Sequence, residues 1–242
     1  MTDHTGGEIE VRAADGGRFV AYLSVPPARP APGLLLLPEI YNVNDHIRAV
    51  ADGFAAQGFV VLAPDVFWRI APGTWLAYTP EGQAQARALN ARLDVDRLVA
   101  DLGACIAALR ARPECTGKVG VAGFCLGGKL AFLCAARHAI DAAVSYYGVK
   151  IEDYLDQADR VSCPMVMHFA GNDSHVPPEA VAAITARMAG HDNVAIHVYP
   201  GAEHAFNRTG YPPYHEAHAQ TALARTLALF RDALAPAAVP GE

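Results

Sequence analysis

The sequence predicts one α/β domain with a mostly parallel central sheet flanked by helices. Continuous apolar runs such as 34–37 and 59–63 are typical of strands that are buried on both faces. Amphipathic segments such as 44–57 alternate with these runs, which favours helices on both faces of the sheet. A chain of 242 residues suits one large domain. We therefore expect a single domain over 1–242, with an ordered core over about 8–234.

The first elements differ from this alternation. Residues 8–13 and 18–25 flank the turn sequence Asp15-Gly16-Gly17, which favours a β-hairpin. A proline-rich connector over 26–32 then leads to the first buried strand.

The rest of the chain continues the alternation after an irregular aromatic segment at 66–80. Further strands are predicted at 118–122, 142–146, 165–170 and 194–199. Further helices are predicted at 81–112, 126–138, 178–190 and 213–234, and a frayed tail at 235–242.

Composition excludes several classes of protein. The formal net charge is −6, and no cluster of Lys or Arg offers a nucleic-acid footprint. The N-terminal residues lack the pattern of a secretory signal, and no apolar run is long enough to span a bilayer. The five cysteines form no C-x-x-C pair, so neither a disulfide framework nor a structural zinc site is expected. We expect a cytoplasmic chain with reduced thiols.

The most informative segment is the predicted strand-to-helix turn around Cys125, with the sequence Gly-Phe-Cys-Leu-Gly-Gly over 123–128. Such a turn exposes its middle residue at the carboxyl edge of a sheet, beside a helix N-terminus. The helix dipole favours a thiolate at that position. Cys125 is therefore the candidate nucleophile, and a buried structural thiol is the alternative.

Two further reactive residues follow the ends of later predicted strands. Asp173 comes directly after 165–170, in Gly-Asn-Asp, and His204 follows 194–199, in Gly-Ala-Glu-His. The chain order nucleophile, acid, histidine is that of the α/β-hydrolases. In this hypothesis His204 accepts the proton of Cys125, and Asp173 orients the imidazole and stabilises its charged form. A turn aspartate and a surface histidine are the alternatives.

Acyl transfer also requires donors for an oxyanion. The N–H groups of Ile40 and Leu126 are the candidates, because they follow the end of an earlier strand and the nucleophile itself. Glu39 lies at the same strand end, where a carboxylate opposes both a thiolate and an oxyanion. A solvated loop carboxylate is one interpretation of Glu39, and the residues alone supply no catalytic one.

The whole chain resembles the dienelactone hydrolase (carboxymethylenebutenolidase) family of small α/β-hydrolases, which have a Cys-His-Asp triad and no separate cap domain. The matching segments are Pro38–Asn44, Ala63–Phe67, Gly123–Gly128, Tyr146–Gly148, Gly171–Asp173 and His204–Phe206. The resemblance implies that Glu39 pairs with Cys125 and helps to deprotonate it once substrate arrives. It also implies a reference reaction, the conversion of dienelactone to maleylacetate in chloroaromatic degradation.

The resemblance further implies that arginines bind a substrate carboxylate. Arg208 matches one such position, whereas Gln83 stands where a second arginine is expected. Arg87 lies one turn later on the same predicted helix face and is the candidate replacement, with a solvated helix residue as the alternative. Aromatic side chains are expected to wall the pocket, namely Phe67, Trp68, Trp75, Tyr78 and Tyr147.

Together these features predict an enzyme that opens a small lactone or enol ester through an acyl-enzyme on Cys125. An esterase, thioesterase or acyltransferase of another small substrate is the alternative, and a ligand-binding protein without activity is a third. No cofactor or metal is expected, since His215 and His218 lack a third ligand and no phosphate-binding loop is present. The expected partner is the small substrate, with no nucleic acid and no membrane, for a monomer or small homo-oligomer.

Overall fold

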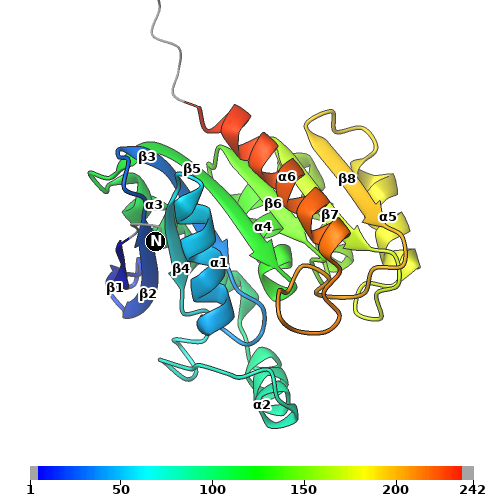
Figure 1. Ribbon diagram of the computed structural model, residues 1–242, viewed down its shortest axis with the longest axis horizontal. Helices are drawn as coiled ribbons and strands as arrows, with labels where there is room; N and C mark the ends of the chain where they lie inside the picture. Colours follow the sequence, from blue (N-terminus) through cyan, green and yellow to red (C-terminus); the bar gives the residue numbers. More distant parts are fainter. Residues whose placement is uncertain (1–4, 236–242) are drawn as a thin grey trace, which may run out of the picture.

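The computed structural model describes residues 5–235 as an eight-stranded sheet with helices on both faces (Figure 1). The strands are β1 (Thr5–Arg12), β2 (Arg18–Val25), β3 (Ala31–Leu37), β4 (Val60–Pro64), β5 (Cys115–Phe124), β6 (Ala142–Tyr146), β7 (Met165–Ala170) and β8 (Val194–Tyr199). The helices are α1 (Asp45–Ala56), α2 (Pro80–Asn90), α3 (Val95–Arg110), α4 (Leu126–Arg137), the 3-10 helix η1 (Glu152–Arg160), α5 (Pro178–Met188) and α6 (Glu216–Ala233).

The sheet is mostly parallel, as the buried apolar runs predict. Its strand order is β1-β2-β4-β3-β5-β6-β7-β8, and every pair from β4 to β8 is parallel. The expected hairpin β1–β2 joins this sheet at one edge, where β2 pairs with β4 in antiparallel register. The predicted α/β fold with a flanked parallel sheet is confirmed.

Two apolar clusters cover the two faces of the sheet. Helices α1 and α6 pack on one face, around Phe54 and Phe230. Helices α3, α4 and α5 pack on the other, around Leu102, Phe132 and Ile184. Figure 1 shows α1 and α6 on the near face, and α2 projecting away from the sheet. No helix among the described residues is long and apolar enough to cross a membrane.

Several predicted boundaries differ from the structure. The helical segment expected at 81–112 is two helices, because Asp94 starts a new helix by accepting a hydrogen bond from the N–H of Arg97. The 3-10 helix η1 was not predicted, and α6 begins at Glu216 rather than at residue 213. Of the expected frayed tail, residues 236–242 lie outside the described residues, as do residues 1–4 of the expected domain.

Candidate active site

The turn between β5 and α4 holds Cys125 in a backbone conformation that few residues adopt. Its φ is 54° and its ψ is −112°, and its N–H donates to the carbonyl of Tyr146 at 3.0 Å. The neighbouring glycine is required, since a Cβ on Gly127 would lie 2.2 Å from the carbonyl oxygen of Leu37. The side chain that this strained turn presents is a free thiol.

Asp173 and His204 form the hydrogen-bonded pair that the strand ends predict. Asp173 lies directly after β7, and its Oδ2 is 2.8 Å from Nδ1 of His204. Its Oδ1 accepts the backbone N–H groups of His175 at 2.7 Å and of Val176 at 3.2 Å. The aspartate side chain is fully buried, so these contacts fix both the carboxylate and the orientation of the imidazole.

The other imidazole nitrogen of His204, Nε2, is not bound by Asp173. Among the described residues, Nε2 of His204 is buried and has no well-formed hydrogen bond. Burial alone lowers the pKa of His204, but the charge of Cys125 and hydrogen bonding with Asp173 and Cys125 raise it to about 10. An imidazolium beside a thiolate is therefore favoured once the thiol loses its proton.

Strand register brings Glu39 next to the nucleophile. Leu37 of β3 pairs with Gly123 of β5, and Glu39 and Cys125 each follow two residues later. Parallel neighbours lie about 4.8 Å apart, so the two residues leave the sheet at the same edge, and both line one cavity. The first helical N–H groups have no intrahelical acceptor, which leaves that of Leu126, the first residue of α4, available for an oxyanion.

The carboxylate of Glu39 interacts with two side chains, those of Tyr78 and Arg208. It is 4% exposed. Its Oε2 accepts a hydrogen bond from the Tyr78 hydroxyl at 3.0 Å and lies 3.5 Å from Nη1 of Arg208. The guanidinium of Arg208 stacks over the Tyr78 ring, 4.4 Å from its centroid. The charge of Glu39 is therefore balanced by an arginine rather than left facing the thiol.

A cavity of about 470 Å³ joins these groups. Its lining includes six residues predicted for the site, namely Glu39, Ile40, Arg87, Cys125, His204 and Arg208, and also Gln83. Its size falls within the range of small-molecule sites, about 300–1,000 Å³. Arg87 is exposed and makes no ion pair within residues 5–235, so its charge is available to an anion at the cavity.

None of the five predicted wall residues lines this cavity. Phe67 is fully buried in the core. Trp68 stacks on Phe19 with ring centroids 4.9 Å apart and donates to Asp101 at 3.0 Å. The expectation that Phe67 and Trp68 contact substrate is therefore wrong in its geometry, because core packing directs both side chains away from the cavity.

Tyr147 also lies outside the cavity lining, but its ring packs against the imidazole of His204. Its ring centroid is 4.7 Å from that of His204, and its hydroxyl donates to Asn207. It therefore supports the histidine and the segment that carries Arg208, rather than forming a wall of the pocket. Trp75, which was also expected at the pocket, is 49% exposed.

Two basic residues near the nucleophile were not predicted from the sequence. The ring of His175 lies 4.5 Å from that of His204 and faces the cavity. Lys129, one turn after Cys125 on α4, is 8% exposed. Burial lowers the pKa of Lys129, whereas the charges of Cys125, Asp153 and Glu152 raise it. The turn sequence after Asp173 does not predict the position of His175, and the apolar sequence of α4 does not predict that of Lys129.

One group of side chains among the described residues has ligand atoms close enough together to share a metal ion. Asp173, His175 and His204 bring such atoms within 4.8 Å of one another. Two of the three are already joined by the Asp173–His204 hydrogen bond, so a cation at this position would compete with the pair that orients the imidazole.

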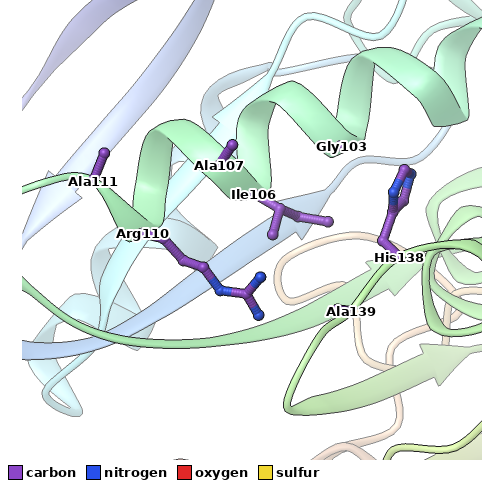
Figure 2. A pocket seen from close by; sticks show the side chains of 7 residues that line it. All are labelled: Gly103, Ile106, Ala107, Arg110, Ala111, His138 and Ala139. Carbon is purple, nitrogen blue, oxygen red and sulfur yellow. The ribbon is translucent and has the colours of Figure 1, made fainter.

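A second hollow, about 450 Å³ in volume, lies at the opposite end of α4 (Figure 2). Figure 2 shows Ile106 and Arg110 projecting from α3, and His138 from the segment after α4. Since α4 has 12 residues, this end of the helix is about 18 Å from Cys125. Arg110 is paired with Asp141 at 3.3 Å. This hollow is therefore separate from the nucleophile and offers no unpaired arginine.

The fold and the strained turn at the end of β5 are those of the α/β-hydrolases, and the protein is an ester hydrolase of that class. Within that class, the chain belongs to the dienelactone hydrolase family, whose model matches residues 19–234. The resemblance inferred from the sequence is thereby confirmed.

Individual relatives match over nearly the full length of the chain. The chain is 38% identical over 229 residues to a carboxymethylenebutenolidase of Pseudomonas putida, covering 94% of this chain and 95% of the relative. It is 36% identical over 222 residues to carboxymethylenebutenolidase 1 of Cupriavidus pinatubonensis, covering 91% and 94%. A Klebsiella pneumoniae structure assigned as a dienelactone hydrolase superposes with a TM-score of 0.85 at 25% identity, covering 94% of this chain and 98% of that one.

Proposed function

We propose that this enzyme opens a small anionic lactone or enol ester, with dienelactone to maleylacetate as the reference reaction, through an acyl-enzyme on Cys125. The observation that carries the proposal is that Cys125, His204, Glu39 and Arg208 line one cavity. These four groups supply a nucleophile, a base, a carboxylate beside the thiol and a cation for a substrate carboxylate. The carboxymethylenebutenolidase names of the relatives support the substrate class.

Acylation starts when the substrate carboxylate binds Arg208. Because Arg208 is the ion-pair partner of Glu39, the two carboxylates compete for it, and the displaced Glu39 takes the proton of Cys125. The thiolate then attacks the lactone carbonyl, and the N–H groups of Ile40 and Leu126 donate to the oxyanion. Collapse of this intermediate breaks the ring C–O bond and leaves a thioester, and the released enolate oxygen takes the proton that Glu39 removed from Cys125, which restores the carboxylate of Glu39.

Deacylation uses the Asp173–His204 pair. His204 removes a proton from water, and the resulting hydroxide attacks the thioester carbonyl while Asp173 stabilises the imidazolium. The C–S bond breaks, the acid product leaves, and the proton on His204 returns to the sulfur of Cys125. Overall, one water molecule is consumed and one carboxylic acid and one enol are formed, so the protons balance.

We also propose that Arg87 provides the second contact to the substrate carboxylate in place of Gln83, which the unpaired charge of Arg87 at the cavity supports. A cytoplasmic location is part of the same proposal. It is supported by the five cysteines, which are all free thiols in the structure.

Steady-state hydrolysis of cis- and trans-dienelactone, beside a neutral aryl acetate, tests the proposal. Cys125→Ala should abolish turnover and Arg208→Ala should remove the preference for the anionic lactone. Arg97→Ala, an exposed arginine paired with Asp15, is the matched control and should behave as wild type. Wild-type activity in Cys125→Ala would refute the mechanism, and turnover of the aryl acetate alone would refute the substrate class.

Alkylation identifies the nucleophile independently. The dienelactones should protect the reactive thiol, and peptide mapping should locate the modification at Cys125. Cys115 is the internal control, because it is the cysteine with intermediate exposure whereas the other four are buried. Modification of Cys115 alone would contradict the assignment.

A further inference from the structure

Tyr78 is the residue that joins Glu39 and Arg208 into one unit. Its hydroxyl donates to Oε2 of Glu39 at 3.0 Å, and the same oxygen lies 3.5 Å from Nη1 of Arg208. The face of its ring carries the Arg208 guanidinium at 4.4 Å. A single side chain therefore contacts both the carboxylate and its counter-ion.

The hydroxyl of Tyr78 is held in place by the packing of its ring. Tyr41 and Tyr211 pack against it with ring centroids 4.5 Å and 4.6 Å away. Burial and the charge of Glu39 raise the pKa of Tyr78, so the phenol stays protonated and remains a donor at any pH at which the enzyme works. Glu39 therefore faces a fixed neutral donor beside a fixed cation.

A guanidinium and a hydroxyl that converge on one carboxylate oxygen form an anion subsite. In the structure this subsite is filled by a side chain of the protein itself, Glu39, which is 4% exposed. The register of β3 and β5 places Glu39 beside Cys125 as well. The structure shows the carboxylate against Tyr78 and Arg208, and the thiol of Cys125 lines the same cavity.

We propose that Tyr78 is a positioning residue that, with Arg208, holds Glu39 in an anion subsite until the carboxylate of a substrate replaces it. This inference rests on the proposed function, and it adds a residue that determines substrate selectivity. Once Glu39 is displaced, the Tyr78 hydroxyl becomes a donor to the incoming carboxylate, in addition to Arg208 and the proposed contact from Arg87.

The exchange of carboxylates predicts an unusual result for Tyr78→Phe. Both Glu39 and the substrate lose the same hydrogen bond, so the KM of an anionic substrate changes little. Without substrate, however, Glu39 is held by Arg208 alone and reaches the thiol more often. Cys125 should therefore react faster in the absence of any carboxylate, and the preference for anionic over neutral esters should fall.

The direct test is the rate of alkylation of Cys125 by iodoacetamide, a neutral reagent, with the protein alone. Tyr78→Phe should raise the rate constant about tenfold, the equivalent of ~1.4 kcal/mol and the low end of a hydrogen bond to a charged group. Its pH profile should move to lower pH. Tyr211→Phe is the matched control, since Tyr211 packs on the same ring, and it should leave the rate and profile as in wild type.

A double-mutant cycle separates positioning from a structural effect. In Glu39→Gln, the further change Tyr78→Phe should alter the alkylation rate by less than about twofold, because Tyr78 acts through Glu39. An equal acceleration in both backgrounds, or none in either, overturns the proposal. So does the same acceleration in Tyr211→Phe.

A measurement on the wild-type protein keeps the proposal testable if Tyr78→Phe does not fold. Sodium acetate, against sodium chloride at equal ionic strength, should accelerate alkylation of Cys125 by displacing Glu39, and Glu39→Gln should show no acceleration. Protection by acetate, or no effect, overturns the proposal. None of these measurements requires turnover of a lactone, so failure here is distinct from failure of the proposed reaction, which dienelactone hydrolysis decides.

Discussion

The substitution Asp173→Asn distinguishes the proposed role of His204 in deacylation from that of Glu39 in activating the thiol. The Oδ2 atom of Asp173 accepts from Nδ1 of His204, and its Oδ1 accepts the backbone N–H groups of His175 and Val176. An amide has one accepting oxygen, so asparagine cannot satisfy both sets of donors. If its NH2 group faces His204, Nδ1 must accept and the imidazole proton moves to Nε2, which can then no longer take a proton from water.

The expected loss of activity in Asp173→Asn follows from these contacts. The wrong imidazole tautomer lowers kcat about 10⁴-fold in serine hydrolase triads, equivalent to about 5.5 kcal/mol. The opposite orientation sets the NH2 group against two backbone donors, and a lost buried hydrogen bond costs about 1–3 kcal/mol of stability. The Asp173 side chain is fully buried, so solvent cannot restore either contact. We expect the steady-state rate to fall about 10⁴-fold, whereas Glu39 still activates the thiol.

The assay must therefore separate acylation of Cys125 from deacylation. On mixing with dienelactone, Asp173→Asn should accumulate an acyl-enzyme that intact-protein mass spectrometry detects, and Cys125→Ala should not. Asp192→Asn, an exposed aspartate, is the matched control and should turn over as wild type. Turnover of Asp173→Asn within tenfold of wild type would refute the role of the pair. Loss of turnover without acyl-enzyme would assign thiol activation to His204 rather than to Glu39.

Two further predictions concern stability and titration. Thr226→Val leaves the Tyr146 hydroxyl and Nε2 of His168 without their hydrogen bonds to Thr226. The free energy of unfolding should fall by about 3 kcal/mol, which lowers Tm by roughly 6–12 °C in thermal unfolding. An unchanged Tm would contradict a stabilising role of these hydrogen bonds. In Cys125→Ala the pKa of His204 should fall from about 10, because the charge of Cys125 is the strongest influence that raises it, and NMR titration of the imidazole measures this pKa. A raised pKa stabilises the fold below pH 6.5, and this stabilisation is lost as the pH rises to 10. The difference in free energy of unfolding between wild type and variant should therefore become smaller between pH 6.5 and pH 10.

Much of the fold could be predicted because burial dictates it. The run 34–37 is fully buried, as strands covered on both faces require. Apolar periodicity was less informative within 81–112, where Leu93 continues the stripe across the break between α2 and α3. The break is marked instead by the cap Asp94, whose side chain accepts the N–H group of Arg97 in the first turn of α3. A helix cap therefore marks the boundary between α2 and α3, which the apolar periodicity does not show.

The candidate site was predictable where strand ends determine it and not where loops do. Cys125, Asp173 and His204 each follow a parallel strand, so topology alone brings them to one edge. Tyr78 comes from the irregular segment at 66–80, where no period fixes side-chain directions. Its position depends on hydrogen bonds to neighbouring carbonyls, such as that of Asn44 to Leu76. Such contacts follow from the tertiary structure and not from local sequence.

The contacts of Glu39 also determine which kinetic constant should report selectivity. A neutral ester can enter the cavity but cannot replace Glu39 at Arg208 and Tyr78, so it meets a thiol whose neighbouring carboxylate is still engaged. In the proposed mechanism an anionic ester releases that carboxylate on binding, and the released base acts in the transition state rather than in the ground state. The difference between the two substrates should therefore lie mainly in kcat. A difference confined to KM would show that Arg208 only binds the substrate and does not couple its arrival to the activation of Cys125.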